Sequence, residues 1–216
     1  MEDEQEVSLR PFGDGRPAPA RDLADLHRKL LPTSPLLLLG RRFLEDFYYG
    51  VVPEEGLAFG TVAYENGRPV AFVVATGDSN GFLSTAIKRR WKSLASVTVR
   101  HPPSPKAGWQ ALRLLASRGR GGDTEPDLGE ILSLGVLPPD AGGPSSSKVR
   151  RTLSHCLVDN VLTRLSDRPV IALVDETNAP ARLMYGAMGW TVEKTVTAGW
   201  PVPQLVYRST DRPPAA

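Results

Sequence analysis

The chain has 216 residues, a length that fits one domain with a substantial core. Its hydrophobic fraction of 41% and charged fraction of 23% are typical of soluble proteins, and its only cysteine, Cys156, excludes an intramolecular disulfide framework. The formal net charge is +2, but nine basic and no acidic residues lie between Gly81 and Arg120, which leaves 17 basic against 24 acidic residues elsewhere.

The first residues lack the basic and then apolar order of a secretory signal, and no apolar run approaches the ~20 residues that cross a bilayer. We therefore expect a soluble, cytoplasmic protein.

The first part of the chain is predicted to form a strand and two helices. Val7–Phe12 alternates as a short strand does, and Asp22–Leu31 has apolar residues at helical spacing. Leu36–Tyr49 is predicted to be a second helix that ends at Gly50.

A β-hairpin follows. Leu57–Glu65 and Pro69–Thr76 are rich in strand-forming residues, and the dipeptide Asn66–Gly67 between them favours a tight turn because both residues tolerate positive φ.

Residues 77–127 form a basic helical insertion, with predicted helices at Phe82–Val97 and Lys106–Ser117. Apolar residues of the first helix form a stripe: Phe82, Leu83, Ala86, Ile87, Trp91, Leu94 and Ala95. Basic residues lie beside it: Lys88, Arg89, Arg90 and Lys92. Three interpretations stay open: a docked lid with solvated charges, a surface for an acidic or phosphorylated substrate, or contact with an anionic membrane. Nucleic acid is not expected as a partner, because no recognition motif accompanies the charge.

The second part of the chain alternates strands and helices. Its predicted elements are the strand Leu128–Leu137, the loop Pro138–Ser147, the helix Lys148–Leu165, the buried strand Pro169–Val174, the helix Ala179–Met188, and the strands Thr191–Ala198 and Gln204–Arg208. The sequence therefore predicts one α/β domain over residues 1–216, a mixed sheet of about seven strands flanked by helices, with residues 77–127 inserted.

One strand–helix unit carries a specific motif. Directly after the strand, Asn178, Ala181, Tyr185, Gly189 and Trp190 follow the pattern Asn-x-x-Ala-x-x-x-Tyr-x-x-x-Gly-aromatic. Asn178 suits the N-cap of the helix, and Ala181 and Tyr185, four residues apart, share one helix face. Gly189 suits the left-handed conformation that ends the helix.

This motif resembles the signature of the GNAT superfamily of N-acetyltransferases, and the inserted helices resemble those of a bacterial subset. The resemblance implies direct transfer of an acetyl group from acetyl-CoA to an amine. It places Tyr185 near the coenzyme sulfur, where a phenol can protonate the leaving thiolate. It also gives Asn178 a contact with the pantetheine arm, although capping the helix would alone explain this residue.

The resemblance further implies that the coenzyme binds along the strand Leu128–Leu137. Backbone groups of Leu134, Gly135 and Val136 would pair with the pantetheine amides. The following loop departs from the family pattern, because Ala141 stands where Arg or Gln is usual. Donors for the pyrophosphate would come from Gly142, Gly143, Ser145, Ser146, Ser147 and Lys148, with charge from Lys148, Arg150 or Arg151. The alternative is a surface loop that binds phosphate weakly or not at all.

The resemblance also makes Glu130 the candidate general base, because family members often carry a glutamate on this strand. Amine attack on a thioester needs the neutral amine, so a base or a water chain is required. The alternative is a glutamate that faces solvent near a strand end. His155 and Cys156 point in different directions on one helix and form no nucleophile pair, and no metal site is predicted.

The function expected is an N-acyltransferase for an unidentified amine. The alternative is a protein of the same fold that binds acyl-CoA without turnover, as a sensor or partner module. The sequence does not predict the oligomeric state.

Overall fold

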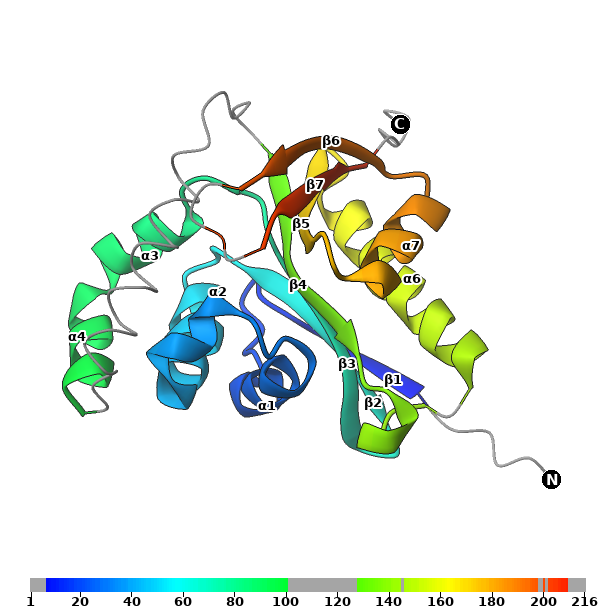
Figure 1. Cartoon of the computed structure of the whole chain (residues 1–216). Helices are drawn as coiled ribbons and strands as arrows, with labels where there is room; N and C mark the ends of the chain where they lie inside the picture. The colour runs from blue at the N-terminus through cyan, green and yellow to red at the C-terminus, as the bar shows by residue number, and fades with distance from the viewer. Residues whose placement is uncertain (1–6, 101–127, 145, 198–199, 201, 210–216) are drawn as a thin grey trace.

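The structure is a computed structural model, and it describes residues 7–100, 128–144, 146–197, 200 and 202–209 (Figure 1). Seven strands form one mixed sheet in the order β1-β2-β3-β4-β5-β7-β6. Their bounds are β1 (Val7–Phe12), β2 (Phe59–Glu65), β3 (Arg68–Thr76), β4 (Gly129–Val136), β5 (Val170–Asp175), β6 (Thr191–Val196) and β7 (Gln204–Arg208). Only β4 and β5 pair in parallel. The predicted mixed sheet of about seven strands is therefore confirmed.

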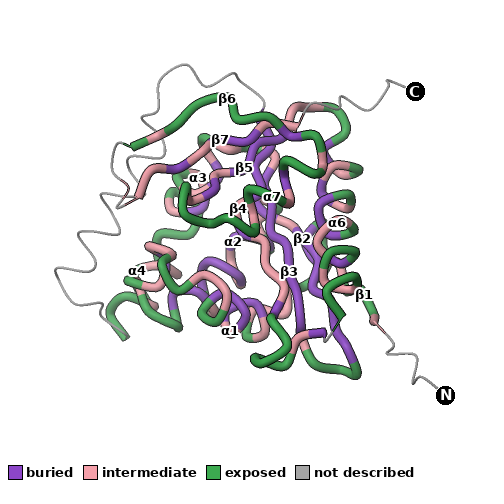
Figure 2. The backbone as a smooth tube through the Cα atoms, turned by 45° about the vertical axis from the view of Figure 1, so that its right-hand side comes forward, coloured by how far each residue is buried: buried purple, intermediate pink, exposed green. Residues whose placement is uncertain are grey.

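Helices cover both faces of the sheet (Figures 1 and 2). One side holds α1 (Ala20–Leu30), the 3₁₀ helix η1 (Pro35–Leu39), the π-helix η2 (Phe43–Val51), α2 (Val52–Glu54), α3 (Phe82–Arg89) and α4 (Trp91–Arg100). The other side holds α6 (Ser147–Arg164) and α7 (Ala179–Ala187), and the short 3₁₀ helix η3 (Pro139–Ala141) follows β4. Each layer of helices packs on its own buried apolar cluster. No helix in the described part of the chain has the length and apolarity needed to cross a bilayer.

The sheet divides where β4 meets β5. These strands pair over three residues only, from Gly129 opposite Val170 to Ile131 opposite Ala172. On the other edge of β4, Ile131 faces Ala75 while Ser133 faces Val74, so that Leu132 is an extra residue in the ladder. Such a bulge bends its strand. Beyond it, β4 continues along β3 and leaves β5.

The predicted helix Leu36–Tyr49 was wrong in its continuity and its end. Gly40 has φ 88°, a left-handed conformation that ends η1, and a new helix begins at Phe43. That helix does not stop at Gly50 but runs to Val51 and on into α2. A side chain at Gly50 would place its Cβ 3.0 Å from the Glu45 carbonyl oxygen, so that glycine here permits close backbone approach rather than helix termination.

The predicted helix Phe82–Val97 is two helices, separated at Arg90 with φ −123° and ψ 33°. Phe82 and Ala86 are buried as the apolar stripe predicted, but Trp91 is 59% exposed because it begins the second helix after the bend. Arg89 and Arg90 both contact the Glu55 carboxylate. The predicted helix Lys106–Ser117 lies outside the described residues.

The predicted hairpin turn and the predicted apolar face of the helix Lys148–Leu165 are confirmed. Asn66 and Gly67 have φ of 51° and 74°, as a tight hairpin turn requires. The face of α6 predicted to be apolar packs on the sheet, with Leu153, Leu157 and Val161 buried.

Candidate active site

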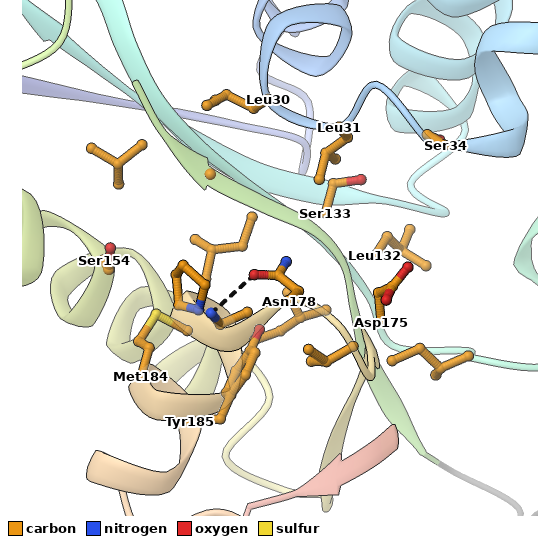
Figure 3. A pocket seen from close by; sticks show the side chains of 18 of the residues that line it. Leu30, Leu31, Ser34, Leu132, Ser133, Ser154, Asp175, Asn178, Met184 and Tyr185 are labelled. Carbon is orange, nitrogen blue, oxygen red and sulfur yellow. Dashed lines mark hydrogen bonds between the residues drawn. The ribbon is translucent and has the colours of Figure 1, made fainter. Parts of the chain in front are cut away.

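A cavity of about 1030 Å³ opens where β4 and β5 separate. Its walls are residues 131–136 of β4, 173–175 of β5, one face of α6, one face of α7, the loop after α1 and the start of β7 (Figure 3). The cavity thus draws on both halves of the sheet. No residue of α3 or α4 lines it.

Tyr185 forms part of this cavity although its side chain is almost fully buried, with 3% exposure. Its ring stacks on Tyr207 at 5.5 Å and contacts Trp190 at 4.8 Å between centroids. Figure 3 shows the hydroxyl pointing into the cavity toward Asn178. Burial raises the pKa of Tyr185 above its ordinary value of 10, so the phenol is held in its neutral, proton-bearing form.

Asn178 is the N-cap of α7, as predicted. Its side-chain oxygen accepts a hydrogen bond from the Ala181 backbone N–H at 3.2 Å (Figure 3). Gly189 has φ 80° and provides the left-handed exit, after which Trp190 folds back and is 5% exposed. These two ends fix α7, and α7 in turn directs Tyr185 into the cavity.

The outer part of β4 supplies an unpaired strand edge. Leu134, Gly135 and Val136 pair with β3 on one side, and no described strand pairs with them on the other. All three line the cavity. Gly135 has a further structural role, because a Cβ there would lie 2.8 Å from the Leu30 Cδ1 atom. This edge can pair with an extended ligand that carries amide groups.

The loop after β4 forms hydrogen bonds within itself. The N–H groups of Gly142 and Gly143 donate to the carbonyls of Pro139 and Pro138, at 3.1 and 2.9 Å. A Cβ at Gly143 would lie 1.8 Å from the Leu137 carbonyl oxygen, so this position requires glycine. The predicted role of both glycines as phosphate donors therefore has no support in their hydrogen bonds.

The start of α6 supplies the cations of the site. Ser146 is its N-cap and accepts from the Val149 N–H at 3.5 Å, while Ser147 and Lys148 are exposed in its first turn. Ser145 lies outside the described residues. One turn further on, Arg150 and Arg151 line the cavity, whereas Lys148 does not.

Glu130 does not face solvent, which excludes the alternative left open by the sequence. It is 3% exposed, and its Oε2 accepts a hydrogen bond from the Ser79 hydroxyl at 2.8 Å. It lies beside the cavity rather than on its surface, one residue before the wall begins at Ile131.

Two residues that line the cavity were not predicted from the sequence. Ser133 lines it from the bulged part of β4, and Asp175 lines it from the end of β5. Asp175 had a usable signal, because side chains at the carboxyl end of a parallel strand commonly face the ligand site of an α/β sheet. Ser133 had none, since its orientation follows from the bulge.

No protein-family model and no curated protein matches the sequence significantly. Solved structures do match along nearly all of the chain. An Arabidopsis thaliana NAA60 in complex with acetyl-CoA is 17% identical, covers 94% of this chain and 98% of its own, and has a TM-score of 0.53. A Drosophila melanogaster polyamine N-acetyltransferase, an enzyme that forms N-acetylagmatine, is 18% identical over 94% and 99%, with a TM-score of 0.57.

A third structure is an aminoglycoside 6'-acetyltransferase type Ii, 14% identical over 97% of this chain and 99% of its own, with a TM-score of 0.55. At identities this low, the similarity concerns the backbone fold and not the residues of the site. With its sheet order, the divergence of β4 from β5 and these neighbours, the chain has the GNAT fold.

Proposed function

We propose that this protein is an N-acyltransferase that moves an acetyl or other short acyl group from acyl-CoA directly to an amine. One observation carries the proposal: the cavity between the diverging strands combines an unpaired β4 edge, cations of α6 and the buried Tyr185 hydroxyl. The GNAT fold of its structural neighbours supports it.

The cavity is suited to the shape and charge of acyl-CoA. The β4 edge at Leu134–Val136 would pair with the pantetheine amides, with Asn178 close by. Arg150 and Arg151 would hold the phosphates, together with Lys148 and the hydroxyls of Ser146 and Ser147 at the start of α6. The bound thioester supplies an activated acyl carbon that an amine can attack.

Two side chains would move the protons. Tyr185 would donate the proton that the departing thiolate takes up, since its hydroxyl faces the cavity and stays protonated, and the excess proton of the attacking nitrogen would restore the hydroxyl. Glu130 would accept the proton of the substrate ammonium through water, from its buried place beside Ile131. A backbone N–H of β4 would hold the oxygen of the tetrahedral intermediate.

The test separates binding from turnover. Calorimetry with acetyl-CoA measures binding, and release of free thiol over a panel of amines measures transfer. We expect binding, and thiol release that depends on the added amine. Absence of thiol release with every amine would overturn the proposed transfer.

The second candidate is an acyl-CoA-binding protein without turnover. The observation that favours it is the loop after β4, where Ala141 replaces the usual polar residue and the Gly142 and Gly143 N–H groups bond within the loop. Binding of acetyl-CoA without thiol release for any amine would favour this candidate.

A further inference from the structure

The charges that line the cavity are separated by sign. Cationic Arg150 and Arg151 lie on α6. Among the described lining residues, Asp175 is the only carboxylate. Figure 3 shows it beside Leu132, across the cavity from the α6 residue Ser154. If the anionic coenzyme binds at the end of the cavity next to α6, the acceptor binds at the opposite end, where Asp175 lies.

The Asp175 carboxylate is held in one orientation. Its Oδ1 accepts from both the backbone N–H and the hydroxyl of Thr177, at 2.8 and 2.6 Å. No described group donates to its Oδ2. Asp175 lies at the end of β5, where its backbone pairs with Gln204 of β7. A fixed carboxylate with one oxygen available is suited to receive a single ammonium group.

Apolar side chains make up much of the cavity wall. They include Leu31 and Leu36 near the end of α1, Leu132 of β4, and Val202 and Trp200 before β7. A ligand that fills the cavity buries apolar surface, while a second positive charge there would be desolvated without a second carboxylate among the described lining residues.

We propose, building on the acyl transfer proposed above, that the acceptor is a monocationic amine with an apolar body and that Asp175 is its counter-ion. The described part of the basic insertion gives no support to an acidic or phosphorylated acceptor. Arg89 and Arg90 contact Glu55, and neither α3 nor α4 reaches the cavity.

The test measures acceptor binding without turnover. Calorimetry on the full chain saturated with CoA would compare 2-phenylethylamine with the uncharged 2-phenylethanol, the dication putrescine and the anion-bearing O-phosphoethanolamine. We expect 2-phenylethylamine to bind more tightly than each of the others. Its advantage over the alcohol should be about tenfold, the size of one charge-assisted hydrogen bond.

Two matched substitutions locate the effect. Asp175→Asn should remove the tenfold preference of amine over alcohol and leave CoA affinity and the melting temperature unchanged. Glu176→Gln makes the same change of charge one residue away, on an exposed side chain outside the cavity, and should change nothing. If Asp175→Asn fails to fold, the ranking of the four probes on the unsubstituted protein still decides.

Several outcomes would overturn the inference. They are equal binding of amine and alcohol, tightest binding of putrescine or O-phosphoethanolamine, or equal effects of the two substitutions. Failure of the proposed function looks different, because CoA would then not bind, or the bound amine would release no thiol from acetyl-CoA.

Discussion

Tyr185 is both part of the core and the proton donor proposed for the reaction. Burial raises its pKa, which by itself makes the phenol a weaker acid. A thiol has an unperturbed pKa of about 8.5, and desolvation in the same cavity raises that value too. Donor and acceptor therefore shift in the same direction, and transfer between them remains feasible. The ring of Tyr207, stacked on it, and the tilted ring of Trp190 hold the donor in place.

Tyr185→Phe tests this role. Phenylalanine keeps the ring contacts with Trp190 and Tyr207 but removes the hydroxyl. We expect kcat to fall by about a hundredfold or more, as for other lost acid catalysts, with the affinity for acetyl-CoA little changed. Steady-state thiol release and calorimetry measure the two quantities. An unchanged kcat would remove Tyr185 from the mechanism.

His27 is a buried residue that makes the stability of the protein depend on pH. It is 1% exposed, its Nδ1 lies 2.6 Å from the Tyr49 hydroxyl, and no described residue forms a hydrogen bond with its Nε2. Burial lowers its pKa from 6.5 to about 4. Between these values the unfolded chain binds a proton that the folded chain does not, so protonation favours unfolding.

We therefore expect the free energy of unfolding to decrease as the pH falls from 6.5 toward 4, by roughly 3 kcal/mol in total. Above pH 6.5 this contribution is constant. His27→Phe should flatten the dependence in that window. Urea titrations across the pH range measure it. A slope that survives in His27→Phe would contradict the assignment.

Elements whose limits depend on local chemistry were predicted well from sequence. The cap Asn178, the exit Gly189 and the hairpin Asn66–Gly67 each follow from a residue's own conformational or hydrogen-bonding preference. The break at Gly40 and the bend at Arg90 were not predicted, because the apolar spacing continues across both. At Gly40 the residue itself was a usable signal, since glycine readily adopts the φ of 88° that ends η1.

The features of the site that depend on several strands were also missed. The β4 bulge at Leu132 arises from pairing with β3, so the sequence of β4 alone does not reveal it. The burial of Glu130 and the exposure of Ser133 to the cavity follow from that pairing. The periodicity of the sequence predicted a strand here, but the register of β4 against β3 determines which side chains reach the cavity.

The loop after β4 offers a prediction on one element. Gly143→Ala would place a Cβ against the Leu137 carbonyl oxygen, so η3 and the start of α6 must move. We expect a loss of about 1–3 kcal/mol of stability and at least roughly tenfold weaker binding of acetyl-CoA. Gly142→Asn is the matched control, because its φ of 86° tolerates asparagine and nothing lies within 4 Å of the added Cβ. Equal effects would show that the loop does not position the coenzyme site.

At the scale of the whole molecule, the sheet has two parts, β1-β2-β3-β4 and β5-β7-β6, joined by three residue pairs of β4 and β5. Helices of each layer reach the cavity between these parts, with the end of α1 on one side and α6 and α7 on the other. A ligand in the cavity adds contacts to both parts where the strands themselves have separated.

Bound acetyl-CoA should therefore stabilise the molecule and do so unevenly. At a hundred times its Kd it raises the free energy of unfolding by about 2.7 kcal/mol, which a thermal or urea titration detects. Hydrogen exchange should slow most at Leu134 and Val136, because alternate N–H groups of β4 point away from β3 and gain partners only from the ligand. The amides between β1 and β2 already pair within the sheet and should change least. Tyr185→Phe should retain this pattern, since its hydroxyl is proposed to act in transfer. Uniform protection, or protection confined to α3 and α4, would place the coenzyme outside the cleft between β4 and β5.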